Sequence, residues 1–499
     1  MRASGILMPI TSLPSKYGIG CFSKEAYDFV DNLANAYQSY WQILPIGPTS
    51  YGDSPYQSFS TFAGNPYFID LEQLVLEGLI TNEEINQFDW GDNSEYIDYE
   101  KIYLSRKPIL QIAFSRAELS KNTDYQLFRE ANSEWLYDYA LYMAIKDHFG
   151  GIMWSEWKED IKTREPEAIN YYDNLLKSEM EYYEFVQFKF YEQWEKLKSY
   201  ANEKGIKIIG DIPIYVAYDS ADTWANPDVF QMDEKKNLTG QAGVPPDGFS
   251  KTGQLWGNPL YNWEYLKETG FSWWKKRIMH HVKIFDVIRI DHFRGFDAYY
   301  HVPAGDKTAE HGTWKPGPSF SFFQALQEEL SQIDIIAEDL GYLTESVFKL
   351  LSDTGYPGMK ILQFAFDSRE AETSAYLPHN YIENSVVYTG THDNETTRGW
   401  FKDLDKEDKK FFLSYIGRKD IDEEEAAEIV IRMAMSSVSK LCIIPIQDYL
   451  NLDNQARINT PSTLGGNWMW RLKVGQLTEE TFKTVKQITK IYGRKQVRK

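Results

Sequence analysis

The chain has 499 residues, with 53 Lys and Arg against 73 Asp and Glu, so its formal net charge at pH 7 is −20. This negative balance argues against a nucleic-acid partner, because nucleic-acid binding needs a concentrated basic surface. An apolar fraction of 42% with 25% charged residues is typical of a globular protein with a large core and excludes a disordered chain.

Eight short apolar runs, rich in β-branched residues, are spread along the chain, and each ends in a polar or glycine-containing turn. They cover residues 5–10, 40–46, 206–216, 285–293, 333–340, 359–364, 386–392 and 441–447. Nearly continuous apolar character is expected of strands that are covered on both faces. We therefore predict eight buried strands of a parallel sheet.

Helical periodicity lies between these runs. An apolar stripe before the third run consists of Val186, Phe190, Trp194 and Leu197, and a similar stripe over residues 426–438 precedes the eighth run. Strands that alternate with helices form right-handed parallel crossovers, and eight such units predict a closed (β/α)8 TIM barrel of the α/β class. We expect residues 1–499 to form a single barrel domain.

Two intervals between the predicted strands are too long for simple loops. Residues 66–200, after the second strand, contain helical patterns and predict a mainly helical insertion. Residues 218–274, after the third strand, are rich in Gly, Pro and Asn and predict an insertion that is an extended loop near the barrel mouth. Four glycines within residues 243–258 indicate a mobile loop there, although a static surface loop explains them nearly as well.

Four of the predicted strands end in acidic residues. These are Asp211 in the third strand, Asp291 in the fourth, Glu338 in the fifth and Asp393 in the seventh. A single acid at a strand end is commonly a turn residue or a helix cap. Several acids at the carboxyl rim of one barrel repel one another, and such an arrangement is typical of a catalytic site.

The types of the neighbouring residues suggest roles for these acids. Arg289 and Asp291 are two residues apart on a strand, so they share a face, and the guanidinium favours the ionised carboxylate that a nucleophile needs; a structural ion pair explains the pair equally well. Glu338 follows an apolar strand, where desolvation suits a general acid, although an ordinary strand-end acid is the simpler interpretation. Asp393 beside His392 suits a ligand rich in hydroxyl groups, or else forms an Asx-turn.

Other classes of function are less well supported. The first strand lacks the His-x-His of metal-dependent barrel hydrolases, no phosphate-binding glycine motif is present, and Cys21 and Cys442 are too few for a disulfide framework or a Cys-x-x-Cys metal site. We recognise no targeting segment and no apolar window long enough to cross a bilayer, so we expect a cytoplasmic protein with no membrane partner and no metal. The aromatic content of 15% serves the core and also suits stacking on sugar rings.

A series of motifs along the chain resembles the 4-α-glucanotransferase family, also called amylomaltases or disproportionating enzymes. The motifs are SGIL at 4–7, TSLPS at 11–15, LPIGP at 44–48, GDSPYQS at 52–58, GDIPIY at 210–215, GVPPD at 243–247, GQLWGNP at 253–259, RIDHF at 289–293, AEDLG at 337–341, THDN at 391–394 and GNW at 466–468. They stand in the order found in the family and span nearly the whole chain.

The resemblance implies a role for each matching residue. It implies that Asp291 is the nucleophile, Glu338 the acid/base and Asp393 the stabiliser of the transition state. It further implies substrate-binding residues, namely Tyr56, Asp211, Trp256, Arg289 and His392. The family acts on α-1,4-glucans and maltooligosaccharides, needs no cofactor, and lacks the C-terminal β domain of related amylases.

The resemblance thus implies a retaining transfer of a 1,4-α-glucan segment to the 4-hydroxyl of an acceptor sugar. A retaining α-glucan hydrolase of the same superfamily would use the same acids and stays open as an alternative. A non-catalytic glucan-binding protein is less favoured, because binding alone does not require three mutually repelling acids. The acidic composition does not fix an oligomeric state.

Overall fold

The computed structural model of the chain describes residues 2–50, 52–246, 250–330, 333–341, 343–370 and 373–495. Eight parallel strands close into a barrel in the order β1-β12-β11-β10-β9-β6-β3-β2. They are β1 (Ala3–Leu7), β2 (Tyr40–Gln42), β3 (Lys207–Pro213), β6 (Val287–Asp291), β9 (Ile335–Ala337), β10 (Gly358–Ile361), β11 (Ser385–Tyr388) and β12 (Leu441–Pro445). Each lies within or overlaps one of the predicted runs, so the TIM barrel is confirmed.

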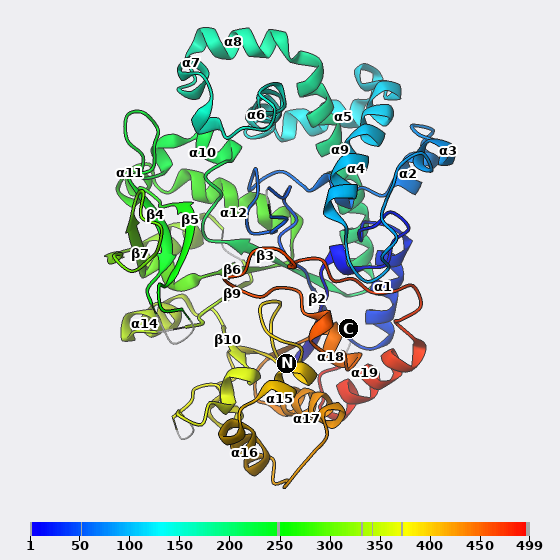
Figure 1. Cartoon of the computed structure of the whole chain (residues 1–499), viewed down its shortest axis with the longest axis vertical. Helices are drawn as coiled ribbons and strands as arrows, with labels where there is room; N and C mark the ends of the chain where they lie inside the picture. The colour runs from blue at the N-terminus through cyan, green and yellow to red at the C-terminus, as the bar shows by residue number, and fades with distance from the viewer. Residues whose placement is uncertain are drawn as a thin grey trace.

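Helices surround the barrel and also extend from one side of it (Figure 1). Between β2 and β3 lie α2 (Leu71–Leu76), α3 (Asn82–Ile85), α4 (Tyr99–Arg116), α5 (Thr123–Ala131), α6 (Leu136–His148), α7 (Glu159–Lys162), α8 (Pro166–Leu175) and α9 (Lys177–Glu203). Most of these helices project to the top of Figure 1, away from the barrel strands. The long interval after the second strand therefore holds the helical structure that its sequence pattern predicts.

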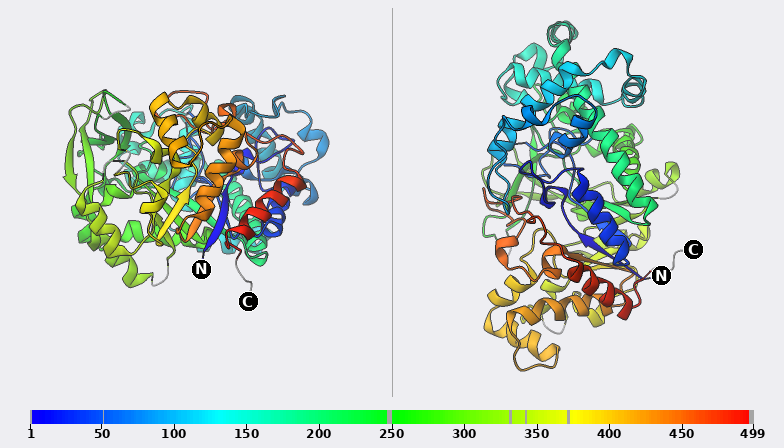
Figure 2. Two further views of the ribbon diagram at one scale, coloured as in Figure 1. Left: turned by 90° about the horizontal axis from the view of Figure 1, so that it is seen from below. Right: turned by 90° about the vertical axis from the view of Figure 1, so that its right-hand side faces the viewer.

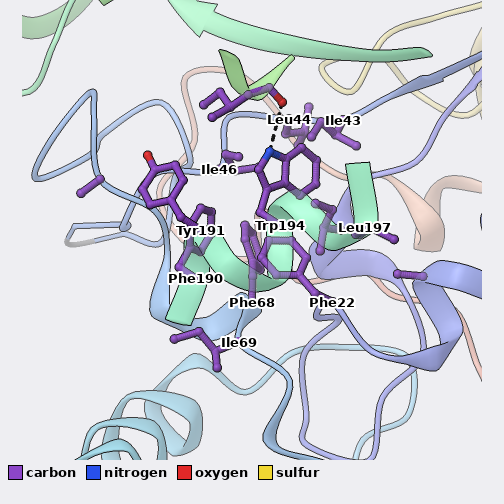
Figure 3. Close-up of a cluster of buried hydrophobic side chains, with 14 of the residues drawn as sticks. Phe22, Ile43, Leu44, Ile46, Phe68, Ile69, Phe190, Tyr191, Trp194 and Leu197 are labelled. Carbon is purple, nitrogen blue, oxygen red and sulfur yellow. Dashed lines mark hydrogen bonds between the residues drawn. The ribbon is translucent and has the colours of Figure 1, made fainter. Parts of the chain in front are cut away.

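Helix α9 attaches this helical region to the barrel. Trp194 on α9 is fully buried, and its indole N–H donates to the main-chain oxygen of Ile284 at 3.0 Å. Around it pack Phe22, Phe68 and Phe190, with ring centroids of Phe22 and Trp194 5.3 Å apart (Figure 3). The predicted apolar stripe on this helix thus forms part of the main core.

Further helices pack around the barrel. They are α1 (Lys24–Asn35), α12 (Ser272–Ile284), α13 (Phe320–Glu329), α14 (Glu345–Thr354), α15 (Thr397–Asp403), α16 (Lys406–Tyr415), α17 (Glu423–Ser436), α18 (Ile446–Tyr449) and α19 (Glu479–Ile491). Figure 2 shows α1 and α19 side by side, so the two ends of the described chain meet on the barrel wall. The described residues after β12 include no further strand, and none of the described helices has both the length and the apolar character of a membrane span.

A second, small sheet lies at the left of Figure 1 and was not predicted. Its antiparallel strands, in the order β5-β4-β7-β8, are β4 (Gly240–Val244), β5 (Gln254–Pro259), β7 (Ala298–Pro303) and β8 (Thr313–Pro316). The interval 218–274 is therefore wrongly described as an extended loop, since it also contains α10 (Ala221–Ala225) and α11 (Trp263–Glu268). These strands could not be recognised from the sequence, because β4 is short and contains two glycines and because every residue of β8 is exposed. Neither strand shows the alternation of apolar and polar residues that indicates a strand.

The predicted mobile loop over residues 243–258 coincides with the hairpin of β4 and β5. Residues 247–249, which come between these strands in the sequence, lie outside the described residues. Within the described part of this segment, residues 243–244 and 254–258 belong to strands, with Trp256 on β5.

Candidate active site

The predicted acids and their neighbours meet at one rim of the barrel, because the carboxyl ends of parallel strands face the same way. They are Asp211 on β3, Arg289 and Asp291 on β6, Glu338 directly after β9, and His392 and Asp393 in the turn after β11. In the order of the barrel, β6 lies between β3 and β9, and β11 is separated from β9 only by β10. The site therefore spans about half of the rim.

Arg289 joins two of these acids. Its Nη1 lies 2.7 and 2.6 Å from the two carboxylate oxygens of Asp211 and 3.0 Å from Oδ1 of Asp291. The register explains the contact, since Asp211 and Arg289 are paired residues of neighbouring strands and Asp291 is two residues further along β6. The Asp211 side chain is fully buried, whereas that of Asp291 keeps 30% of its surface exposed. Arg289 is thus both a structural ion pair and a direct contact of the predicted nucleophile.

Glu338 is held by main-chain amides. The N–H of His292 donates to Oε2 at 2.6 Å, and the N–H of Leu340 donates to Oε1 at 2.9 Å. His292 adopts the left-handed conformation with φ 54°, which is uncommon for a residue with a side chain and occurs at functional sites. The Phe293 N–H also donates to the main-chain oxygen of Glu338 at 3.0 Å, so the turn after β6 fixes both the main chain and the carboxyl of Glu338.

Burial sets the titration of the two carboxyls. Desolvation raises the pKa of Asp291 well above its usual value; the charge of Arg289 opposes this rise, and the neighbouring Glu338 adds to it. Desolvation also raises the pKa of Glu338, against the opposing effects of Arg289 and of the amides that it accepts from. Two coupled carboxyls of this kind release their protons in two separate steps, so the pair holds a single proton over an interval of pH.

A hydrogen-bonded chain connects β3 with the turn after β11. The Tyr56 hydroxyl donates to Oδ2 of Asp211 at 2.7 Å and lies 2.8 Å from Nε2 of His392, and the Tyr56 and His392 rings stack with centroids 5.3 Å apart. Since the single hydroxyl proton goes to Asp211, we assign the N–H of His392 to Nε2. Burial lowers the pKa of His392, so the ring is neutral, and its Nδ1 has no hydrogen-bond partner among the described residues.

Asp393 is more open than Glu338, with 43% of its side chain exposed. The Asn459 side-chain amide donates to Oδ1 at 2.6 Å, and Nε2 of His392 lies 3.4 Å from Oδ2. Arg457 donates to the main-chain oxygen of Asp393 at 2.8 Å. The exposed carboxylate is accessible to the hydroxyl groups of a ligand.

Some residues of the site carry no signal that sequence reasoning could use to assign them a role. Asn459 and Arg457 follow β12 by more than ten residues, and only the folded chain brings them to Asp393. Trp468 lies within one of the recognised motifs, and its ring centroid is 5.7 Å from that of Tyr56 and 6.0 Å from that of His392. The resemblance gave this tryptophan no role, and its packing against the site is visible only in the folded chain.

Trp256 lies at the β6 side of the rim. Its ring meets that of His292 edge to face with centroids 4.9 Å apart, and it also approaches Tyr215 at 6.2 Å. Trp256 is half-buried on β5, so the small sheet contacts the barrel rim at His292, the residue that follows Asp291. Among the described residues, no group of three or more His, Cys, Asp or Glu is arranged to hold a metal ion.

The comparisons with known proteins agree on one family. A family model described as 4-alpha-glucanotransferase matches residues 8–478. A 4-alpha-glucanotransferase of Clostridium butyricum is 50% identical over 98% of this chain and 100% of its own, and one of Thermus thermophilus is 45% identical over 96% of both. The solved structure of the amylomaltase from Streptococcus agalactiae in complex with acarbose has a TM-score of 0.95 and 45% identity, and covers 99% of this chain and 100% of that one.

Proposed function

Because the chain belongs to the 4-α-glucanotransferase family and is a glycosyltransferase, we propose that it transfers 1,4-α-glucan segments by a retaining double displacement. The acceptor is the 4-hydroxyl of glucose or of a maltooligosaccharide. The observation that carries this proposal is the pair of acids Asp291 and Glu338 at the ends of the adjacent strands β6 and β9. Retaining enzymes use one carboxyl as nucleophile and the other as acid and base.

The first displacement forms a glucosyl ester. Asp291 attacks the anomeric carbon while Glu338 gives its proton to the glycosidic oxygen, so that the shortened glucan leaves as an alcohol. For the reactive state we assign the proton of the pair to Glu338, because Arg289 contacts Asp291 at 3.0 Å and opposes the rise of its pKa. In the second displacement Glu338 takes the proton of the acceptor 4-hydroxyl, whose oxygen attacks the same carbon and releases Asp291.

The other groups position the sugar and stabilise its positive charge. Asp393, with its exposed carboxylate, is placed to bind ring hydroxyls more strongly as the ring flattens toward the oxocarbenium-like state. His392 lies 3.4 Å from Asp393 and stacks on Tyr56, whereas Asp211 is fully buried and acts by holding Arg289 and Tyr56. The assignment for Asp211 differs from the substrate-binding role that the resemblance implies, whereas those for Asp393, His392 and Tyr56 follow it.

Asp291→Asn tests the nucleophile. We expect the variant to fold and to lose almost all turnover of maltotriose, measured as release of glucose and of longer maltooligosaccharides. Asp286 offers a matched control, because it precedes the amino end of the same strand and accepts the Ile208 N–H at 2.8 Å, far from the rim. Asp286→Asn should keep its activity per folded molecule, and near-normal glucose release by Asp291→Asn would refute the assignment.

The same assay separates transfer from hydrolysis. A ladder of longer maltooligosaccharides with glucose indicates transfer, whereas maltose and glucose alone would indicate the retaining hydrolase. Membership of this enzyme family argues against a purely glucan-binding protein.

Transfer also requires that the acceptor sugar outcompetes water. We propose that the β4–β5 hairpin, within the predicted loop 243–258, covers the acceptor through Trp256, which already stands against His292. Trp256→Ala should raise the ratio of hydrolysis to transfer, and an unchanged ratio would remove this role. A cytoplasmic location fits the two buried and unpaired cysteines, and we propose a single catalytic domain in which both insertions serve the barrel.

A further inference from the structure

The weakest strand pairing among the described parts of the barrel lies beside the proposed acid/base. There β9 and β10 share a single register pair, Ala337 with Gly358, whereas β3 and β6 share five and β6 and β9 share three. Glu338 is the residue that follows Ala337. Its position relative to β10 therefore depends on few main-chain hydrogen bonds.

The side chain of Asp339 adds a link at this point. Its Oδ1 accepts the main-chain N–H of Met359 on β10 at 2.6 Å, and the residue is only 5% exposed. On the other side of Glu338, the Ala337 N–H donates to the main-chain oxygen of Pro357 at 3.0 Å. Glu338 thus lies between two attachments to the β10 segment, one made by the main chain and one by a carboxylate.

The neighbouring strand has room for this carboxyl group because of a glycine. A Cβ atom added to Gly358 would lie 2.4 Å from Oδ2 and 2.7 Å from Cγ of Asp339, closer than real side chains approach. Gly358 does not have a positive φ, so close packing explains the glycine here. The strand and the carboxyl group are therefore fitted to each other.

We propose that Asp339 is a positioning residue for Glu338, and that it fixes the main chain of the acid/base against β10 through the hydrogen bond from Met359. The proposal rests on the proposed function, because it assigns Asp339 an effect on catalysis through Glu338. Nothing in the geometry requires Asp339 to touch the substrate, since its carboxylate is turned toward Met359 and Gly358.

The environment of the Asp339 carboxyl is consistent with a hydrogen-bonding role. Burial raises its pKa to about 7, against the opposing effects of the Met359 N–H and the charge of Lys360, and Glu338 adds to the rise. Both the ionised and the protonated carboxyl keep an oxygen that accepts an N–H. An asparagine keeps such an oxygen as well, while it removes the charge.

Two substitutions separate the hydrogen bond from the charge. Asp339→Ala removes both, and we expect kcat per folded molecule to fall at least roughly tenfold with little change of KM, because small displacements of catalytic groups are costly. Asp339→Asn should restore kcat to within about threefold of the wild type. If Asp339→Asn is as impaired as Asp339→Ala, the charge rather than the hydrogen bond matters and the proposal fails.

Asp286 again provides the matched control. Its carboxylate also accepts the N–H of a residue on the neighbouring strand, Ile208, but at the opposite rim of the barrel. Asp286→Ala should lower the melting temperature and leave kcat per folded molecule unchanged. An equal loss of kcat per folded molecule in Asp286→Ala and Asp339→Ala would show that removal of any strand-linking carboxyl slows the enzyme, and would overturn a specific effect of Asp339 on Glu338.

A donor whose leaving group needs no protonation tests whether Asp339 acts through Glu338. Fluoride leaves α-maltosyl fluoride without protonation, so the rate of the first fluoride release should be far less impaired in Asp339→Ala than transfer from maltotriose. Glu338→Gln must show the same pattern if it is the acid/base. Rescue of Glu338→Gln without rescue of Asp339→Ala would overturn this inference alone, and no rescue of Glu338→Gln would overturn the proposed role of Glu338.

Discussion

Glu338 and Asp393 lie on the same rim of the barrel but are held in different ways. Glu338 is buried, and its carboxyl accepts hydrogen bonds from the main-chain amides of His292 and Leu340. Asp393 has 43% of its side chain exposed and accepts its hydrogen bond from the side chain of Asn459. The first carboxyl is thus fixed by the main chain at the strand ends, and the second belongs to a turn and is open to solvent.

The difference follows from what the two carboxyls are proposed to do. A general acid has to retain its proton and present it at one point, so burial, which raises the pKa of Glu338, and fixed main-chain contacts both serve it. A group that stabilises a sugar cation has to reach the ring hydroxyls, which requires an exposed carboxylate such as that of Asp393. We therefore expect variants of Glu338 and its contacts to respond to the leaving group of the donor, and variants of Asp393 and its contacts not to respond to it.

The largest effect is expected for Glu338→Gln, which removes the proton that the leaving oxygen needs. Transfer from maltotriose should fall by about 10²–10⁴-fold, the usual contribution of a general acid. The first release of fluoride from α-maltosyl fluoride, followed by rapid quenching, should be much less affected. Asp393→Asn serves as the contrast, because Asp393 is proposed to stabilise the sugar ring and not the leaving group. Its loss of activity should therefore persist with the fluoride donor. If fluoride restores the activity of both variants, the proposed difference between Glu338 and Asp393 is wrong.

The pH dependence tests the same pair. Activity requires an ionised Asp291 and a protonated Glu338, so kcat/KM should rise with pH as the first proton leaves the pair and fall as the second one leaves. Because burial raises the pKa of Glu338 above its ordinary 4.5, the falling limb should lie at higher pH than an exposed glutamate would give. Glu338→Gln should lose the falling limb and keep the rising one, and a falling limb that survives in this variant would exclude Glu338 as its source.

The sequence predicted the framework of this comparison better than its details. The acids at the strand ends could be found because strand ends are visible as the limits of apolar runs, and a parallel barrel gathers them at one rim. The partners of Asp393 could not, because Asn459 and Arg457 are brought to it by tertiary folding alone. The small sheet was missed for a related reason, since its short strands depend on pairing between segments on both sides of β6.

A smaller effect is expected for Asp448→Asn, which acts on the side of Asp393. Asp448 on α18 is buried, and its carboxylate accepts hydrogen bonds from the Thr389 hydroxyl at 2.5 Å and from the hydroxyl and N–H of Thr397 at 2.7 and 2.8 Å. One carboxylate therefore closes the turn that carries His392 and Asp393. Asparagine has one acceptor oxygen in place of two, so we expect kcat/KM to fall by roughly tenfold as the turn loosens.

The Asp448→Asn defect should behave like a defect of Asp393. It should persist with α-maltosyl fluoride, and the double variant with Asp393→Asn should be little worse than Asp393→Asn alone, because the two residues act as a unit. Additive losses in the double variant, or a lower melting temperature with unchanged kcat/KM per folded molecule, would contradict a positioning role for Asp448.

The smallest effect is expected for Tyr56→Phe, which removes the hydroxyl that links Asp211 on β3 with His392 in the turn after β11. The lost hydroxyl donates to Asp211 at 2.7 Å and accepts from Nε2 of His392 at 2.8 Å. Asp211 still accepts from Arg289, whereas Nε2 of His392 keeps only Asp393 at 3.4 Å. We expect a loss of about 1 kcal/mol, or roughly fivefold in kcat/KM, that fluoride does not relieve, because the weakened side is that of Asp393. Tyr388→Phe is the matched control, since its hydroxyl donates to Gln42 inside the barrel at 2.8 Å, and it should lower stability while leaving kcat/KM per folded molecule unchanged.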